Sequence, residues 1–87
     1  MPTKFTFSLV TPDEHREYYL QVDELVILPP HSLLTTPISH IWAVAVYATH
    51  YDPIRKSAVV TCRDTKVEPD LLEDYHQRIM AAGWSTY

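Results

Sequence analysis

The residues of this 87-residue chain that could do chemistry are five histidines, one cysteine and a serine beside a predicted turn. The histidines are His15, His31, His40, His50 and His76. Imidazole is the commonest metal ligand near neutral pH. No two of these histidines are four residues apart on a helix or form an HxH pair, and Cys62 has no second thiolate to join it. The spacing therefore predicts no metal site.

A nucleophile is the next candidate. If residues 51–56 form a turn, His50 lies opposite Ser57 with Asp52 nearby, which are the residue types of a Ser-His-Asp triad. A triad also needs preorganised oxyanion donors in a water-excluded cleft, and a hairpin tip without glycine offers none. Cys62 is expected to be a small core side chain. The chain's single glycine also excludes a glycine-rich phosphate loop. We expect no catalytic residue and no cofactor.

Four of the seven basic residues lie within twelve positions of the predicted second hairpin, namely Arg55, Lys56, Arg63 and Lys66. Such a basic patch can contact phosphates or an acidic protein surface. The formal net charge is -4, from 11 acidic and 7 basic residues. This balance argues against a binder of duplex DNA, which must neutralise several phosphates.

Aromatic side chains indicate binding more strongly. Eight of the ten are Trp or Tyr, the types enriched at interface hot spots. They are more large side chains than one helix on one small sheet would normally cover, which predicts a dimer face or a ligand-binding surface. The candidate binding residues are Tyr18, Tyr19, Trp42, Tyr47, Tyr51, Tyr75 and Trp84.

The first part of the chain predicts a β-hairpin, with a helix as the alternative for its second arm. Apolar residues alternate with polar ones from Phe5 to Leu9, as in a strand with one buried face. Residues 12–28 also fit a helix, because residues 11–14 have the form of a capping box with proline at the first helical position. We favour the hairpin, with residues 11–16 as its turn, because the segment ends in β-favouring residues.

A set of residues spread over this region carries a family resemblance. They are Leu9, Val10, Thr11, Pro12, Val22, Asp23, Leu25, Val26, Leu28, Pro29, His31, Leu34 and Thr35. In this spacing they resemble the opening of the β-sandwich of the ATP-synthase epsilon subunit. The glycine-rich turn of that family is missing here, and nothing after Pro37 matches. The resemblance implies a hairpin and carries no function.

The middle of the chain predicts a connecting loop and a second hairpin. Residues 29–39 contain three prolines and are typical of a loop. Residues 40–50 are apolar on both faces, which predicts a central strand covered on both sides. Residues 57–64 are expected to return antiparallel to it, with alternate residues from Ala58 to Cys62 on one face.

The clearest pattern is an amphipathic helix over residues 68–82. Apolar side chains recur along one face at 3-4-3 spacing, and Pro69 suits the first helical position. Gly83 and Trp84 fit a left-handed helix end, with Trp84 folding back onto Ile79.

These patterns predict one α+β domain over residues 1–87, an antiparallel sheet of about four strands in two β-hairpins with the C-terminal helix packed on one face. The opposite face, with Trp42, is expected to be covered by a second protomer or by the 29–39 loop. No signal peptide and no apolar run near 20 residues is visible, and the single cysteine can form no intramolecular disulfide. We therefore expect a cytoplasmic protein without a membrane role.

The expected function is a non-enzymatic interaction or regulatory domain that forms a homodimer and binds a protein partner. The alternative is a small-molecule binder or minor enzyme with an aromatic-lined pocket between sheet and helix, where Tyr47, Tyr75 and a histidine supply the polar groups. Nucleic-acid binding through the basic second hairpin ranks third, because the net charge opposes it.

Overall fold

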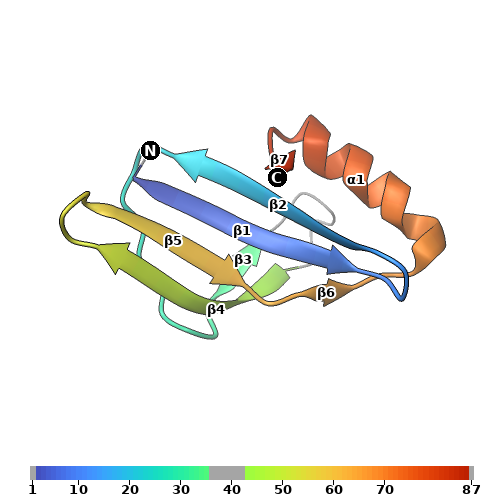
Figure 1. The fold of residues 1–87 in the computed structure, drawn as a ribbon, viewed down its shortest axis with the longest axis horizontal. Helices are drawn as coiled ribbons and strands as arrows, with labels where there is room; N and C mark the ends of the chain where they lie inside the picture. Colours follow the sequence, from blue (N-terminus) through green and yellow to red (C-terminus); the bar gives the residue numbers. More distant parts are fainter. Residues whose placement is uncertain (1, 36–42, 87) are drawn as a thin grey trace.

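The computed structural model describes residues 2–35 and 43–86, which form a curled β-sheet with a short helix against one face (Figure 1). The strands are β1 Thr3–Val10, β2 His15–Val22, β3 Leu33–Thr35, β4 Ala43–Asp52, β5 Ser57–Cys62, β6 Thr65–Lys66 and β7 Ser85–Thr86. A 3-10 turn, η1 Pro69–Leu71, leads into the helix α1 Leu72–Ala81. The strand order is β3-β4-β5-β1-β2-β7, and β6 also pairs with β1.

This architecture corrects the predicted fold class. The protein is mostly β, with seven strands in a mixed, half-barrel sheet, and is not an antiparallel sheet of four strands. Strand β1 pairs with β2 in antiparallel fashion but with β5 and β6 in parallel. Parallel neighbours are joined by long crossover connections, so local sequence patterns do not reveal them. Strands β3, β6 and β7 have only two or three residues, too few to show alternation.

The β1–β2 hairpin confirms the strand interpretation of the region after Pro12, although β2 already ends at Val22. Thr11 holds the turn together. Its hydroxyl oxygen accepts the N–H of Glu14 at 3.0 Å, and its own N–H donates to the Glu14 carbonyl at 2.8 Å. Threonine side chains commonly close turns in this way. The residues that resembled a helix cap therefore close a hairpin.

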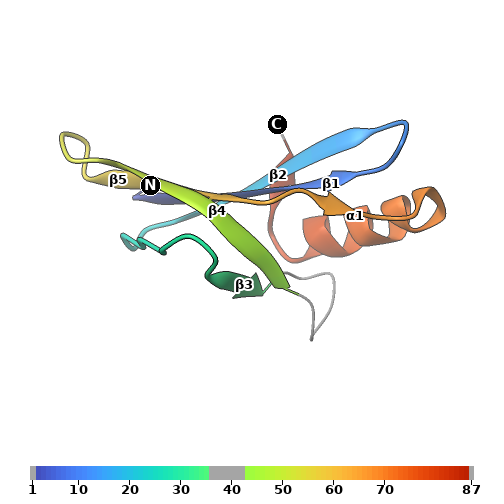
Figure 2. The ribbon, with the colours of Figure 1, turned by 90° about the horizontal axis from the view of Figure 1, so that it is seen from below.

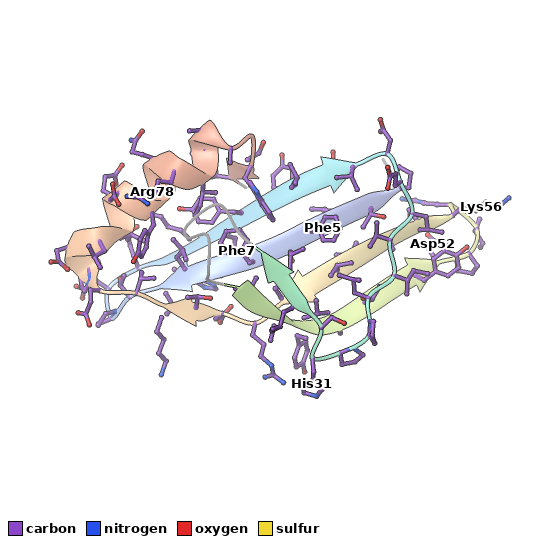
Figure 3. The ribbon with its side chains drawn as sticks, turned by 180° about the vertical axis from the view of Figure 1, so that it is seen from behind. Phe5, Phe7, His31, Asp52, Lys56 and Arg78 are labelled. Atoms are coloured by element: carbon purple, nitrogen blue, oxygen red, sulfur yellow. The ribbon has the colours of Figure 1, made fainter. Side chains whose placement is uncertain are left out.

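One face of the sheet, the covered face, holds the core of the molecule (Figure 3). Its most buried large side chains are Phe7, Leu9, Tyr18, Val46, Val60 and Ile79. The ring of Phe7 stacks on Tyr18 at a centroid distance of 5.5 Å and meets Trp84 edge-on at 4.8 Å. Helix α1 covers one half of this face, and residues 23–32, here called the covering segment, lie with β3 over the other half (Figure 2).

Two threonines attach the covering segment to the sheet. The buried Thr3 hydroxyl donates to the Glu24 carbonyl at 2.6 Å and accepts the N–H of Val26 at 2.8 Å. The Thr49 hydroxyl donates to a second backbone carbonyl of the segment, that of Leu28, at 2.6 Å. The described part of the predicted 29–39 loop thus lies on the same face as the helix. The expectation that this loop covers the opposite face is wrong.

The C-terminal helix is confirmed, with a tighter first turn over η1. Gly83 has a φ of 97°, which the left-handed end of the helix requires. The N–H of Gly83 donates to the Met80 carbonyl at 3.1 Å, and the N–H of Trp84 donates to the Ile79 carbonyl at 3.3 Å. These two bonds form the predicted Schellman motif. They bring Trp84 back over the core.

The strand predicted over residues 40–50 is not central. In the described part, β4 lies next to the edge strand β3, and β5 and β1 occupy the middle of the sheet. The register shifts between Val46 and Ala48, and Tyr47 at this bulge is 60% exposed. Coverage on both sides is therefore wrong for this strand. Trp42 lies outside the described residues.

Candidate functional site

The second face of the sheet, the open face, is covered by none of the described elements, because α1, β3 and the covering segment lie behind the sheet in Figure 1. Its side chains alternate with the core residues along each strand, as the two-residue period of a strand requires. They are Lys4, Thr6, Ser8 and Val10 on β1, His15, Glu17, Tyr19 and Gln21 on β2, Leu33 on β3, Ala45, Tyr47, Ala48, His50 and Asp52 on β4, Ser57, Val59 and Thr61 on β5, and Arg63 just after it.

The middle of the open face is made of small side chains. The register places Ala48 opposite Thr61, Thr61 opposite Thr6, and Thr6 opposite Tyr19. Ser8 follows Thr6 along β1 on the same face. Within the described chain, the hydroxyl groups of Thr6, Ser8 and Thr61 form no side-chain hydrogen bond. These three residues are here called the hydroxyl floor. Ser8 is buried, whereas Thr6 and Thr61 are partly exposed and keep their hydrogen-bonding capacity for an outside group.

A tyrosine with a cation stands on each side of the hydroxyl floor. On the β2 side, Nζ of Lys4 lies 5.1 Å from the ring centroid of Tyr19. On the β4 side, Cζ of Arg63 lies 5.4 Å from the ring centroid of Tyr47. Cation–π contacts at exposed sites contribute about 0.5–1 kcal/mol. They orient two long cationic side chains at the borders of the floor.

The β3–β5 side of the open face carries exposed apolar surface. Leu33, Tyr47 and Val59 are 72%, 60% and 38% exposed. Arg63 lies against the Tyr47 ring in the same region. Tyrosine and arginine beside aliphatic side chains, with few charges, are typical of the core of a protein–protein interface.

The structure places three of the predicted aromatic residues against the core. Tyr18 and Trp84 are buried, and Tyr75 packs partly buried against the same cluster. The Tyr18 hydroxyl and Nδ1 of His76 form a hydrogen bond of 2.9 Å. Burial raises the pKa of Tyr18. Its hydroxyl therefore stays protonated at neutral pH and links β2 to α1.

The other predicted aromatic residues lie at the surface or outside the described chain. Tyr19 and Tyr47 flank the hydroxyl floor on the open face. Tyr51 pairs with a core position of β5 and lies near the hairpin tip, with 45% of its surface exposed. Trp42 lies outside the described residues. Tyr47 and Tyr75 are on opposite sides of the sheet, so they do not line one pocket between sheet and helix.

The four residues of the predicted basic patch lie at two places. Arg55 and Lys56 are in the turn between β4 and β5, where Figure 3 shows Lys56 beside Asp52. Arg63 and Lys66 follow the far end of β5, about 20 Å away at the rise of a six-residue strand. Arg63 consequently belongs to the open face, and Arg55 belongs to the hairpin tip.

The hairpin register keeps the three residues of the triad hypothesis on one face but changes their pairing. Ser57 pairs with Asp52, and His50 pairs with Val59, so the turn has four residues and the expected pairing of His50 with Ser57 is wrong. Burial raises the pKa of the Cys62 thiol to about 11. A thiol with this pKa is protonated at neutral pH and is a poor nucleophile.

A shallow depression of about 350 Å³ lies along the edge of β2, lined by His15, Arg16, Glu17 and Thr86. The guanidinium of Arg16 is ion-paired with Glu73 of α1 at 3.3 Å, so its charge is already neutralised. Among residues 2–35 and 43–86, no three acidic, histidine or cysteine side chains gather closely enough to hold a metal ion. In the same part of the chain, no helix is long and apolar enough to cross a membrane.

The sequence analysis missed Leu33 and the hydroxyl floor. One signal was available, since the alternation along residues 57–64 already placed Val59, Thr61 and Arg63 on a common face. Their neighbours on β1 could not be known, because the parallel pairing with β5 was not predicted. No protein-family model, curated protein or solved structure matches this chain.

Proposed function

We propose that this chain is a non-enzymatic interaction domain that binds a protein partner through its open face. One observation carries the proposal, namely the exposed apolar side chains of Leu33, Tyr47 and Val59 on one face of the sheet, with Arg63 against the Tyr47 ring. None of these three side chains belongs to the buried core or to the partly buried side chains packed against it.

Energetics favours covering these side chains. Moving a large apolar side chain from water into a packed interface yields about 1.5–3 kcal/mol. Leu33 and Tyr47 are two such side chains, and Arg63 adds a cation that lies against the Tyr47 ring. Polar residues of β2, such as Gln21 and Glu17, would provide the polar rim that surrounds most interface cores.

A second copy of the chain is one partner that this proposal includes. A chain of this length buries a limited fraction of its surface, so self-association stabilises it. We expect the wild type to sediment as a dimer at tens of micromolar and a Leu33→Ala/Tyr47→Ala variant to sediment as a monomer. If both proteins sediment as monomers, the homodimer is rejected and the partner must be a different protein.

Paired substitutions test the open face directly. Leu33→Ala/Tyr47→Ala removes an exposed aliphatic and a tyrosine from the open face. Tyr51→Ala/Ile54→Ala removes the same types near the hairpin tip, where Ile54 is 92% exposed. Each protein is immobilised and used to capture partners from a lysate of the cells that produce it. Mass spectrometry identifies the captured proteins, and a specific partner is one that free wild-type protein displaces.

We expect the open-face variant to lose the partner that free wild-type protein displaces and the hairpin variant to retain it. Both variants should be as stable as the wild type. Retention by the open-face pair would refute the proposal. Equal loss by both pairs would also refute it, because the binding would then depend on general exposed surface.

A further inference from the structure

We infer that the partner on the open face is a second copy of this chain, stacked face to face about a two-fold axis that runs parallel to the strands. This inference rests on the proposed function and names the partner of the same surface. The strand order and the register carry it, because they place complementary side chains at positions that this axis brings together.

The strand order fits this symmetry. Strands β5 and β1 lie in the middle of the sheet, with β4 beside β5 and β2 beside β1. A two-fold axis in the plane between the stacked sheets, running between β5 and β1, places each β5 over the partner's β1 and each β4 over the partner's β2. The rotation leaves the position of a residue along the strands unchanged. Two sheets stacked with nearly aligned strands form the usual packing of a β-sandwich.

The exposed hydroxyl groups at the centre match across this axis. Thr61 on β5 pairs with Thr6 on β1, so the two residues lie at the same level along the strands. In the dimer each Thr61 faces the partner's Thr6, and each Thr6 faces the partner's Thr61. A hydroxyl group can both donate and accept a hydrogen bond, so the two groups satisfy each other directly or through one bridging water. Covering the open face with a second copy therefore gives both hydroxyls a partner.

One cation and one carboxylate of the open face match across the same axis. Glu17 on β2 and Arg63 after β5 each lie about two residues beyond the level of these threonines, toward the same end of the sheet. Within one protomer they are two strand spacings or about 10 Å apart. The guanidinium of Arg63 lies over Tyr47 of β4, the strand that faces the partner's β2. Each Arg63 consequently meets the partner's Glu17, and the dimer contains this ion pair twice.

The balance of charge favours a copy of the chain over a ligand of one charge. Among the described residues, the open face and its borders carry both signs, namely Lys4, Arg63 and Lys66 with Glu17, Asp52 and Asp64. A two-fold interface uses the same patch on both subunits and needs both signs on it. Asp52 accepts two N–H groups of its own turn, and Asp64 lies 4.0 Å from Nε2 of His15. Within the described chain Glu17 has no such contact and is left for the second copy.

The test exchanges the two charges. Arg63→Glu sets two glutamates against each other, and Glu17→Arg sets two arginines against each other. We expect each variant alone to have a dimer dissociation constant at least tenfold above that of the wild type in analytical ultracentrifugation. An equimolar mixture of the two variants should form a heterodimer, which native mass spectrometry identifies by its mass. The Arg63→Glu/Glu17→Arg variant should again form a homodimer.

The matched control is Arg55→Glu, which makes the same change of charge at the hairpin tip and should dimerise like the wild type. If it dissociated as readily as Arg63→Glu, general charge repulsion would explain the result and the inference would be overturned. Single variants that dimerise like the wild type, or a mixture that stays monomeric, would also overturn it.

The two proposals can fail separately. If the wild type is monomeric while the Leu33→Ala/Tyr47→Ala variant loses a captured protein of different sequence, the dimer inference fails and the interaction domain stands. If that variant stays dimeric and retains its captured protein, both proposals fail.

Discussion

The two faces of the sheet differ in burial: the covered face holds the hydrophobic core, and the open face is exposed to solvent. Along β1, Phe5, Phe7 and Leu9 point to the covered face and are buried, whereas Thr6 between them points to the open face. Almost all buried apolar residues of the described chain belong to one cluster on the covered side. The same strands therefore carry the core in one set of positions and the proposed binding surface in the other, and we expect that the two can be altered separately.

The largest expected effect is the loss of Phe7. Its ring contacts both Tyr18 and Trp84, so Phe7→Ala removes the centre of the core and should destabilise the fold by about 3–5 kcal/mol. This is a large part of the stability of a domain of this size. Urea unfolding followed by circular dichroism measures it. The neighbouring Thr6→Ala, on the open face, should change the free energy of unfolding by less than about 0.5 kcal/mol.

A smaller effect is expected where the covering segment is attached. Thr3→Val keeps the shape of the side chain but leaves the Glu24 carbonyl and the Val26 N–H without their partner. Each buried polar group without a partner costs about 1–3 kcal/mol. Hydrogen exchange should show faster opening of residues 24–28. Thr61→Val on the open face breaks no such bond. If it destabilised the protein as much as Thr3→Val does, the role of Thr3 in attaching the covering segment would be contradicted.

The pH dependence of stability should come in part from the covered face. Burial raises the folded-state pKa of the Cys62 thiol from 9.0 to about 11. Above pH 9 the unfolded chain gives up this proton before the folded chain does, so stability falls as pH rises. We expect the wild type to lose about 1–2 kcal/mol more than Cys62→Ala between pH 8.5 and pH 11. Equal losses in urea unfolding under reducing conditions would show that the thiol is accessible.

The smallest effect on folding is expected at Tyr47. Tyr47→Ala removes an exposed ring and its contact with Arg63, which together contribute less than about 1 kcal/mol to stability. The same change should weaken binding of the partner at least tenfold, because aromatic residues dominate interface energetics. A melting temperature that falls as far as that of Phe7→Ala would place Tyr47 in the core.

Local patterns were sufficient to predict the local structure. The alternation from Phe5 to Leu9 marks β1, and the sequence around Gly83 specifies the end of α1, because both depend on neighbours in the chain. The alternation from Ala58 to Cys62 also predicts which side of β5 is buried. Each of these features follows from the geometry of a single element or turn.

The assembly of these elements could not be predicted in the same way. The parallel contact of β1 with β5 joins residues more than fifty positions apart, and no periodicity records it. The covering segment is irregular and depends on the hydroxyl of Thr3, which looks like any other threonine in sequence. The open face could not be predicted for the same reason, since Thr6 and Thr61 become neighbours only through that parallel pairing.

Aromatic residues show this limit most clearly. Tyr18 and Tyr19 are adjacent and equally apolar, yet one is buried and the other flanks the hydroxyl floor. The alternation of β2 separates them, but the side that faces the core depends on where α1 packs. Composition therefore indicated a surplus of aromatic surface without locating it.

A saturation mutagenesis scan read out by protease resistance tests the division between the two faces most directly. Charged substitutions at Phe7, Tyr18 and Val60 should abolish resistance, and the same substitutions at Thr6, Tyr47 and Thr61 should leave it near the wild-type level. Equal sensitivity at both sets of positions would mean that the open face is also needed for folding, which contradicts its assignment as a binding surface.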